Sequence, residues 1–291
     1  MSTVRSILKD CGIRPAKRLG QCFLEDKNVM AKIIGAADLH DRDLVVEIGA
    51  GLGLMTEMLA SGVAKVIAVD VDPRMTAIMR TRLPDQPRIE IIEKDFLAFD
   101  FSDFARDGQT AKFKVIGNIP YNISTPILFH LLASRRYITS MVLMFQKEVV
   151  DRLVASPGTK AYGIPSVLLA MFALPSREMN VPASCFYPQP RVDSAVIKIE
   201  MREKPLVELA DELFFSRIVK IAFAMRRKTI LNNLRSAGLP ITSDREIEDL
   251  LERADIESRR RGETLSVEEF GRLSNVFHTA CTLKTGLPKE Y

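Results

Sequence analysis

The sequence predicts an α/β fold with a mainly parallel sheet, followed by a smaller all-helical domain. Three observations lead to this prediction. Short apolar runs alternate with helical patterns through the first two thirds of the 291 residues, and a glycine-rich turn follows the first of these runs. Beyond residue 204 only helical patterns occur. Alternating strands and helices are typical of parallel sheets that helices cover on both faces.

The expected strands are short apolar runs of the kind found in buried sheets. They are LVVEI (44–48), KVIAVD (65–70), RIEII (88–92) and FKVIG (113–117). A further strand is expected around Met141 and Met144, whose side chains should belong to the core. Asp72 followed by Pro73 is typical of a helix start, with the acid as N-cap and proline at the first helical position.

The domain boundary is expected near residue 203. The strand SAVIKIE (194–200) ends shortly before a proline-bearing junction at 203–205, and the segments that follow have helical patterns only. The sequence therefore predicts one domain over residues 1–203 and a second over 204–291.

Composition limits the class of protein. Hydrophobic residues make up 47% and charged residues 27%, as in ordinary globular proteins. No apolar run approaches the roughly 18 residues of a membrane span, and the first residues lack a secretory signal. The four cysteines are scattered and the three histidines do not cluster. We expect a cytoplasmic protein with reduced thiols, no membrane partner and no protein-bound metal.

Basic residues are unevenly distributed. Residues 1–18 hold five Lys or Arg and one acid, and residues 213–243 hold six and no acid, including Arg226, Arg227 and Lys228. Each run alone could be a solvated face, but two uncompensated runs favour nucleic acid. For the run 259–261, a solvated loop and a phosphate contact remain equally open.

A glycine-rich turn follows the first expected strand, in EIGAGLGLMTEML. Gly49, Gly51 and Gly53 allow a tight turn and a close approach of the backbone to a ligand before a helix begins. The dinucleotide fingerprint would require its third glycine one position later, where Leu54 stands. The turn therefore indicates a nucleotide-type ligand of another kind.

Polar residues end the following strands as well. Asp70 ends the second strand, Asp95 follows the third, and Asn118 follows the fourth. Ligands of open parallel sheets bind outside the carboxyl ends of the strands, where these residues and Gly49 should converge. Each acid alone is more typical of a loop or cap, but together they predict a cofactor site.

These residues carry a resemblance to known enzymes. The glycine turn, Asp70, EKDF (93–96) and GNIPY (117–121) resemble S-adenosylmethionine-dependent methyltransferases that act on adenine amines. More narrowly, the chain is similar to the ribosomal RNA small-subunit adenine dimethyltransferases, the kasugamycin-resistance enzymes, over nearly its whole length. Further similar blocks are RLGQCFL (18–24), GNIPYNISTP (117–126), FQKEVVDRLVASPGTKAYG (145–163), FYPQPRVDSAV (186–196) and MRRKTILNNL (225–234).

The resemblance implies a Rossmann-like methyltransferase domain that uses S-adenosylmethionine. It further implies dimethylation of two adjacent adenosines in a hairpin loop near the 3′ end of 16S RNA. The partners would be small-subunit ribosomal RNA and the immature small subunit, bound by a monomer through Arg226, Arg227 and Lys228. The expected cofactor-binding residues are Cys22, Leu24, Gly49, Gly51, Asp70, Asp95 and Asn118.

The catalytic residues are expected in and near GNIPYNIS (117–124). An adenine amine is a weak nucleophile, and two acceptors can steer it by holding its hydrogens: the Asn118 side-chain oxygen and the Ile119 carbonyl. Pro120 fixes the backbone angle of the loop. Tyr121 offers a face for stacking the extruded base, and Phe186 could cover the other face. Catalysis would then rest on positioning and preorganised polarity, without a strong base.

Other functions remain as alternatives. The erythromycin-resistance enzymes, which modify large-subunit RNA, share GNIPYNIS, but PGTKAYG (157–163) argues against them. DNA adenine methyltransferases tend to have a second proline where Ile119 stands. A non-catalytic assembly or RNA-binding factor on the same fold is the contrasting class.

Three individual residues need separate interpretation. The family usually has Asn or His where Cys22 stands, and a thiol is a poorer hydrogen-bond partner. Its backbone could still contact the cofactor, or its side chain could simply be buried. His130 is expected to pack in the core, and Tyr162 could support a substrate channel or only pack.

Overall fold

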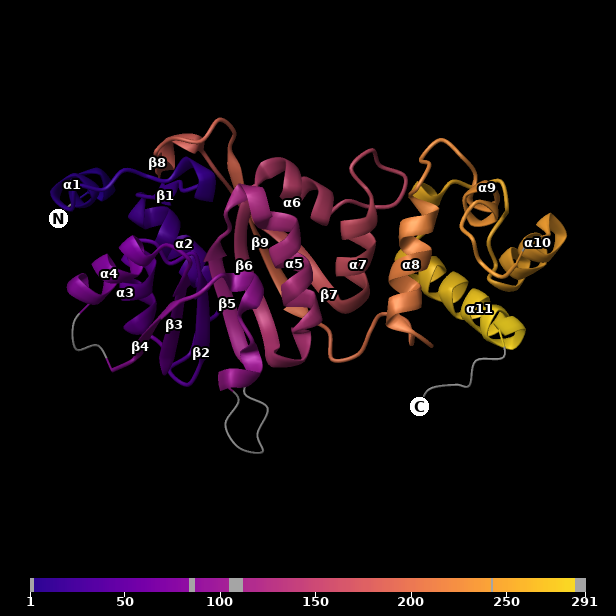
Figure 1. Cartoon of the computed structure of the whole chain (residues 1–291), viewed down its shortest axis with the longest axis horizontal. Helices are drawn as coiled ribbons and strands as arrows, with labels where there is room; N and C mark the ends of the chain where they lie inside the picture. Colours follow the sequence, from indigo (N-terminus) through magenta and orange to yellow (C-terminus); the bar gives the residue numbers. More distant parts are fainter. Residues whose placement is uncertain (1–2, 84–86, 105–111, 242, 286–291) are drawn as a thin grey trace. The chain divides into compact units, whose positions relative to one another are not determined.

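The computed structural model describes residues 3–83, 87–104, 112–241 and 243–285, which form two compact units (Figure 1). The first unit comprises the described residues of 1–150 and 175–201. The second comprises those of 151–174 and 202–291. The first is an α/β unit and the second is helical, as the sequence predicts.

The first unit is built on a seven-stranded, mainly parallel sheet. In spatial order its strands are β4 (Ile89–Glu93), β3 (Lys65–Asp70), β2 (Leu44–Ile48), β5 (Phe113–Asn118), β6 (Ile138–Gln146), β9 (Ser194–Met201) and β7 (Ala173–Val181). The first five run parallel and β9 runs antiparallel to β6. Each strand expected from an apolar run is confirmed to within one residue.

The strand register brings the carboxyl ends of the central strands level. Ile48 of β2 pairs with Val69 of β3 on one side and with Gly117 of β5 on the other. Loops that follow these strands therefore begin at the same edge of the sheet, and residues distant in sequence meet there.

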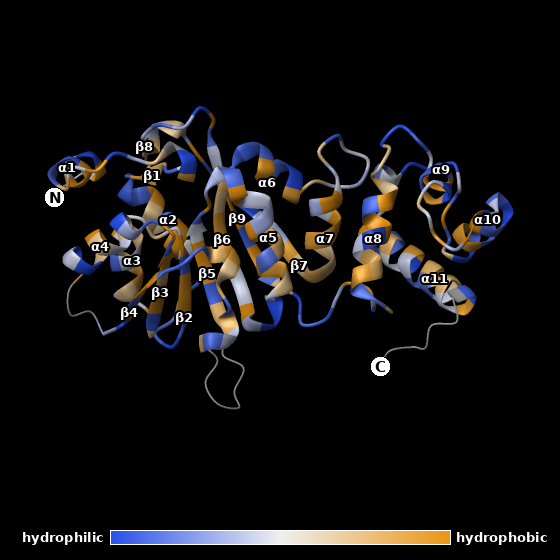
Figure 2. Cartoon of the chain, in the orientation of Figure 1, coloured by the Kyte–Doolittle hydropathy of each residue, from blue (hydrophilic) through white to orange (hydrophobic). Residues whose placement is uncertain are grey.

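Helices pack against this sheet. They are α2 (Lys27–Ala36), α3 (Leu54–Ala60), α4 (Pro73–Arg82) and α5 (Ser124–Ala133), with α1 (Val4–Asp10) and α6 (Lys147–Leu153) at the margins. α4 begins as predicted, because the Asp72 carboxylate accepts from the backbone N–H of Arg74. The central strands are hydrophobic along their length (Figure 2), and Val45 and Val46 are fully buried. Met141 and Met144 lie in the core as expected.

Three strands were not expected from the sequence. β7 (Ala173–Val181) lies at one edge of the sheet, and much of its sequence, ALPSREMNV, is polar and exposed. β1 (Phe23–Leu24) and β8 (Phe186–Tyr187) form a separate two-stranded antiparallel sheet. β7 is polar, unlike β4 at the opposite edge, and a two-residue strand is too short, so none of the three produces the apolar run from which the other strands were inferred.

The second unit contains α7 (Ile164–Phe172), α8 (Glu212–Ala222), α9 (Ile230–Arg235), α10 (Asp244–Arg253) and α11 (Val267–Thr285). Phe172 of α7 meets Phe215 of α8 edge to face, with ring centroids 6.4 Å apart. The chain re-enters this unit at Arg202, close to the predicted boundary at residue 203. Segment 151–174, which the prediction assigned to the first domain, groups with the helices because α7 packs against α8 and α11.

Two negative findings apply to the described part of the chain. No helix there is both long enough and apolar enough to cross a membrane. Nor do three or more His, Cys, Asp or Glu side chains gather there in a way that could hold a metal ion.

Candidate active site

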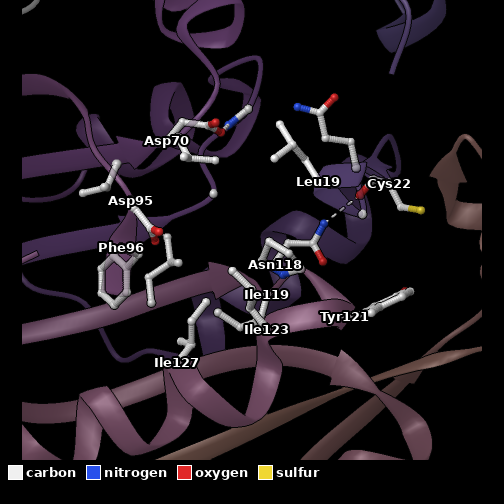
Figure 3. A pocket seen from close by; sticks show the side chains of 18 of the residues that line it. Leu19, Cys22, Asp70, Asp95, Phe96, Asn118, Ile119, Tyr121, Ile123 and Ile127 are labelled. Carbon is white, nitrogen blue, oxygen red and sulfur yellow. Dashed lines mark hydrogen bonds between the residues drawn. The ribbon is translucent and has the colours of Figure 1, made fainter. Parts of the chain in front are cut away.

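A pocket lies at the carboxyl ends of β2, β3 and β5 (Figure 3). The residues predicted to converge there do so, since Gly49, Asp70, Asp95 and Asn118 all line it. Segment 19–23, which precedes α2, and Tyr121 complete the wall. The strand register thus brings together residues from positions 49 to 118, about 70 residues apart in sequence.

The glycine turn after β2 forms the floor of the pocket. Gly49 and Gly51 have φ angles of +67° and +57°, a region that side chains rarely adopt. A Cβ on Gly51 would also lie 3.0 Å from the Phe23 ring. The turn needs glycine for its own geometry, and it exposes backbone to whatever the pocket holds.

Asp70 is held by the same turn. Its carboxylate accepts from the backbone N–H of Gly51 and from that of Asp72, both at 2.8 Å. Burial raises the pKa of Asp70, and these hydrogen bonds oppose the rise. Each oxygen has a further lone pair, so the carboxylate can still accept from a ligand hydroxyl.

A buried carboxyl group lies behind the turn. Glu47 of β2 is 2% exposed, and the Thr56 hydroxyl donates to its Oε2 at 2.5 Å. Burial raises the pKa of Glu47 to about 8, against the opposing hydrogen bond from Thr56. The nearby charge of Asp70 adds to the rise. Glu47 lines a smaller cavity that shares Gly49, Gly51 and Asn118 with the main pocket.

The Asn118 amide has a defined orientation. Its Nδ2 donates to the backbone carbonyl of Cys22 at 2.9 Å (Figure 3). Because a carbonyl only accepts, the NH₂ group must face Cys22, and Oδ1 remains as the acceptor. Cys22 therefore acts here through its backbone. Its thiol is half-buried against the core, and burial raises the pKa of this thiol.

The loop after Asn118 is anchored to the sheet. The Ile119 N–H donates to the Met144 carbonyl of β6 at 3.0 Å, and Pro120 has a φ of −57°. Tyr121 begins a short 3₁₀ turn, and its hydroxyl lies 2.8 Å from that of Ser194 at the start of β9. Burial raises the pKa of Tyr121, so the phenol stays neutral at physiological pH.

Asp95 lies in the pocket wall and also caps the turn that follows β4. Its carboxylate accepts from the backbone N–H of Leu97 at 3.0 Å, and its side chain is exposed. Phe96, next to it, lines the pocket. A capping role and a ligand role are both compatible with this geometry.

Two of the predicted site residues do not line the main pocket. Leu24 and Phe186 face each other in the β1–β8 pair, with exposed fractions of 8% and 3%. Both belong to one hydrophobic core cluster, together with residues of β2, β3 and α3. Phe186 as placed therefore presents no ring face to an extruded base, and Leu24 lines only the smaller cavity.

One pocket residue that sequence reasoning missed is Gln21. Its Nε2 donates to Asp72 Oδ2 at 2.8 Å, and its Oε1 accepts from the Ala16 N–H at 2.8 Å. The Arg74 guanidinium beside Asp72 lowers the pKa of that carboxyl to about 2. Gln21 lies within the RLGQCFL block, but its hydrogen bonds to Asp72 and Ala16 become visible only in the folded structure.

The predicted RNA-binding residues lie in the second unit. Arg226 pairs with Glu263 at 2.7 Å and donates to the Lys160 carbonyl at 3.0 Å. Arg227 and Lys228 are exposed beside it. Arg226 thus holds two loops together, whereas its neighbours face solvent.

The structure also bears on other side chains whose interpretation was open. Tyr162 is 2% exposed and donates to the Leu265 carbonyl at 3.0 Å, which supports the packing alternative. The His130 ring is half-buried against Phe96 and lies 2.9 Å from the Phe99 carbonyl. Arg260 pairs with Glu269, so one member of the run 259–261 has an intramolecular partner.

Comparison with known proteins agrees with this fold and site. The model of the family "Ribosomal RNA adenine dimethylase" matches residues 14–277. A relative from Syntrophus aciditrophicus, named ribosomal RNA small subunit methyltransferase A, is 46% identical over 275 residues, which are 94% of this chain and 98% of the relative.

Solved structures agree as well. A dimethyladenosine transferase from Plasmodium falciparum superposes with a TM-score of 0.76 at 29% identity, over 86% of this chain and 95% of that one. The 23S rRNA methyltransferase ErmE gives 0.67 at 26% identity, over 88% and 99%.

The fold and the pocket define an S-adenosylmethionine-dependent methyltransferase. The chain belongs to the ribosomal RNA adenine dimethylase family. This confirms the predicted family, the enzyme class, the cofactor and ribosomal RNA as the substrate.

The pocket residues fit this cofactor. An adenosine moiety needs acceptors for its ribose hydroxyls and apolar surface for its ring. Asp70 supplies acceptors, Phe96 and Ile127 supply apolar surface, and the Gly49–Gly51 turn allows close approach of the backbone.

Proposed function

We propose that this protein dimethylates the exocyclic amines of two adjacent adenosines in a hairpin loop near the 3′ end of 16S ribosomal RNA, during assembly of the small subunit. The observation that carries this proposal is the orientation of the Asn118 amide. Its NH₂ group is committed to the Cys22 carbonyl, which leaves a neutral acceptor at the pocket.

In this proposal the residues of the β-strand ends hold the cofactor. Asp70 would accept from the ribose hydroxyls of S-adenosylmethionine, and Asp95 would lie near its adenine. The Gly49–Gly51 turn would lie against its methionine part. Leu24 is left out of this set because it lines only the smaller cavity beside the pocket. When bound, S-adenosylmethionine supplies an electrophilic methyl group.

The loop after β5 would present the target base. Asn118 Oδ1 and the Ile119 carbonyl would accept the two amine hydrogens and turn the nitrogen lone pair outward. The Ile119–Met144 hydrogen bond and the fixed φ of Pro120 hold this carbonyl in place. Tyr121 would stack on the base as a neutral ring. The nitrogen becomes acidic only as it gains the methyl group, so its proton can pass to water and no group in this set is required to act as a strong base.

The basic turn of the second unit, formed by Arg226, Arg227 and Lys228, would bind phosphates. Arg227 and Lys228 are exposed, and they would provide the contacts most sensitive to salt. Arg226 would contribute mainly by fixing the turn, through Glu263 and the Lys160 carbonyl.

The small subunit is the better candidate substrate, rather than the large one. The relative named for the small subunit is 46% identical, whereas the 23S rRNA methyltransferase ErmE is 26% identical. An immature particle is the expected partner, because a hairpin near the RNA 3′ end must be accessible before it is packed. We further infer a monomer, since one unit of one chain supplies the pocket residues. A cytoplasmic location is proposed from the ribosomal RNA substrate of the family.

The proposal can be tested with particles from cells that lack this protein. Purified protein and S-adenosylmethionine are incubated with immature small subunits or with large subunits, and RNA fragments are weighed by mass spectrometry. We expect four methyl groups on one hairpin fragment of small-subunit RNA. Methylation of large-subunit RNA alone would favour the erythromycin-resistance type. Binding without methylation would favour a non-catalytic assembly factor.

A further inference from the structure

The Tyr121 ring is tethered at its far end. Its hydroxyl lies 2.8 Å from the Ser194 hydroxyl, which belongs to the first residue of β9. The backbone at Tyr121 is held separately, because the Ser124 hydroxyl donates to the Tyr121 carbonyl at 3.2 Å. A tyrosine has two side-chain torsions; because the phenolic oxygen lies on the axis about which the ring turns, a contact there restricts the first torsion and so fixes where the ring axis points.

Ser194 belongs to a rigid element. It is fully buried and pairs with Gln146 of β6, inside the seven-stranded sheet. The preceding residue is fixed on two sides: the Asp193 carboxylate accepts from the Ala183 N–H at 2.9 Å, and the Asp193 carbonyl accepts from the Lys147 N–H at 3.0 Å. The hydroxyl that meets Tyr121 therefore has little freedom to move.

The contact with Tyr121 also satisfies the buried Ser194 hydroxyl. A buried hydroxyl needs a hydrogen-bond partner, and Tyr121 provides one. On the other side, Tyr121 lines the pocket beside Asn118. The contact thus links the core of the sheet directly to a wall of the pocket, over 73 residues of sequence.

We propose that Ser194 is a positioning residue for methyl transfer: its hydroxyl holds the axis of the Tyr121 ring in place, so that an extruded adenine meets the ring at one position in the pocket. This inference rests on the proposed function, in which the base enters this pocket. Ser194 is buried and does not line the pocket, so it would act only through Tyr121. Reactions that depend on orientation lose rate steeply when a positioning group shifts.

The first test is a double-mutant cycle. Ser194→Ala and Tyr121→Phe each remove one hydroxyl and keep the rest of the side chain. In single-turnover methylation of small-subunit particles at saturating S-adenosylmethionine, each variant should be about tenfold slower than the parent. The double variant should be no slower than either single variant, because both changes break one contact. If the rate of the double variant falls by the product of the two single-variant factors, the two hydroxyls act independently and the proposal is overturned.

A spectroscopic readout separates positioning from a general loss of structure. An RNA hairpin with 2-aminopurine at the target position fluoresces when the base leaves its stack and is quenched on stacking against an aromatic ring. The parent should quench the extruded base, whereas Ser194→Ala should leave it brighter. Affinity for S-adenosylmethionine should be unchanged. Equal quenching in the parent and Ser194→Ala would overturn the proposal.

Two control variants complete the design. Ser166→Ala removes another buried serine hydroxyl, which bonds to the Arg152 carbonyl in the second unit, and it should keep the parental rate and quenching. Tyr121→Ala removes the ring itself. If Tyr121→Ala is slow and Ser194→Ala is not, the positioning role alone fails. If Tyr121→Ala keeps the parental rate, the proposed stacking fails as well. Thermal unfolding checks that each variant is folded, and Tyr121→Phe leaves β9 untouched.

Discussion

The pocket edge and the basic turn use polar residues in opposite ways. At the pocket edge, Asp70 and Asn118 are largely buried and each is hydrogen-bonded to the backbone of another segment. At the basic turn, Arg227 and Lys228 are exposed, and among the described residues only their neighbour Arg226 pairs with a distant carboxylate. The first region depends on geometry and the second on charge. Substitutions should therefore act steeply at the first and gradually, with strong salt dependence, at the second.

The largest effect is expected at Glu47, the most deeply buried acid behind the pocket. Its pKa is raised from an ordinary 4.5 to about 8 in the folded chain. The unfolded chain loses this proton first as the pH rises, so the group lowers stability progressively between about pH 4.5 and 8. The loss is on the order of 5 kcal/mol, at ~1.4 kcal/mol per pKa unit.

Glu47→Gln should remove this contribution and retain an acceptor for Thr56. Urea unfolding across the pH range measures the free energy of unfolding. The advantage of the variant over the parent should grow from pH 4.5 to 8 and then level off. The exposed Glu178→Gln is the matched control and should follow the parent. A constant difference between Glu47→Gln and parent would show that Glu47 titrates normally.

The next largest effect is expected for Asn118→Ala. Loss of one preorganised acceptor should slow single-turnover methylation about 100–1000-fold, as for deletion of an oxyanion-hole donor. RNA affinity should change by less than about tenfold, or 1.4 kcal/mol. Saturating S-adenosylmethionine is needed, because Asn118 also lines the cofactor pocket. Asn122→Ala in the same loop should retain most activity, since Asn122 is exposed. A parental rate in Asn118→Ala would rule out the amide's role.

A smaller effect is expected for Asp70→Ala. The variant loses a charged acceptor for ribose hydroxyls, so S-adenosylmethionine should bind about 1.5–3 kcal/mol more weakly. Calorimetry measures this affinity directly. The exposed Asp41→Ala has the same change in charge and should bind normally. If both variants bind like the parent, Asp70 only organises the glycine turn.

The smallest effect is expected at the basic turn, on the free energy of RNA binding. If Arg227 and Lys228 contact phosphates, neutralising each should reduce the slope of log affinity against log salt by about 0.7–0.9. Cofactor affinity should not change. Arg226→Ala should mainly lower stability, because it breaks the contacts with Glu263 and Lys160. An identical slope in the Arg227→Ala/Lys228→Ala variant would mean that the turn is a solvated face.

Most of the fold could be predicted from local patterns. Buried strands such as β2 and β3 are continuous apolar runs, and the N-cap at Asp72 starts α4 as expected. β7 was missed because an edge strand can remain polar. The placement of α7 with the C-terminal helices was also missed, because it depends on contacts between segments far apart in sequence.

The site could be predicted in position but not in detail. The order of parallel strands places Gly49, Asp70 and Asn118 at one edge, and this follows from the sequence. Burial of Phe186 could not be predicted, because it depends on the pairing of two very short strands. The contact of Tyr121 with Ser194 likewise joins residues for which no local signal exists.

The hydrogen bond from Asn118 ends on a main-chain oxygen, and this has an evolutionary consequence. Every amino acid at position 22 has the same backbone carbonyl, so a mutation of this codon to another amino acid need not remove the contact. A thiol can therefore stand at position 22 without loss of this contact. A substitution at position 22 should therefore affect this contact only through the path of the backbone, whereas its side chain must fit the space beside the core.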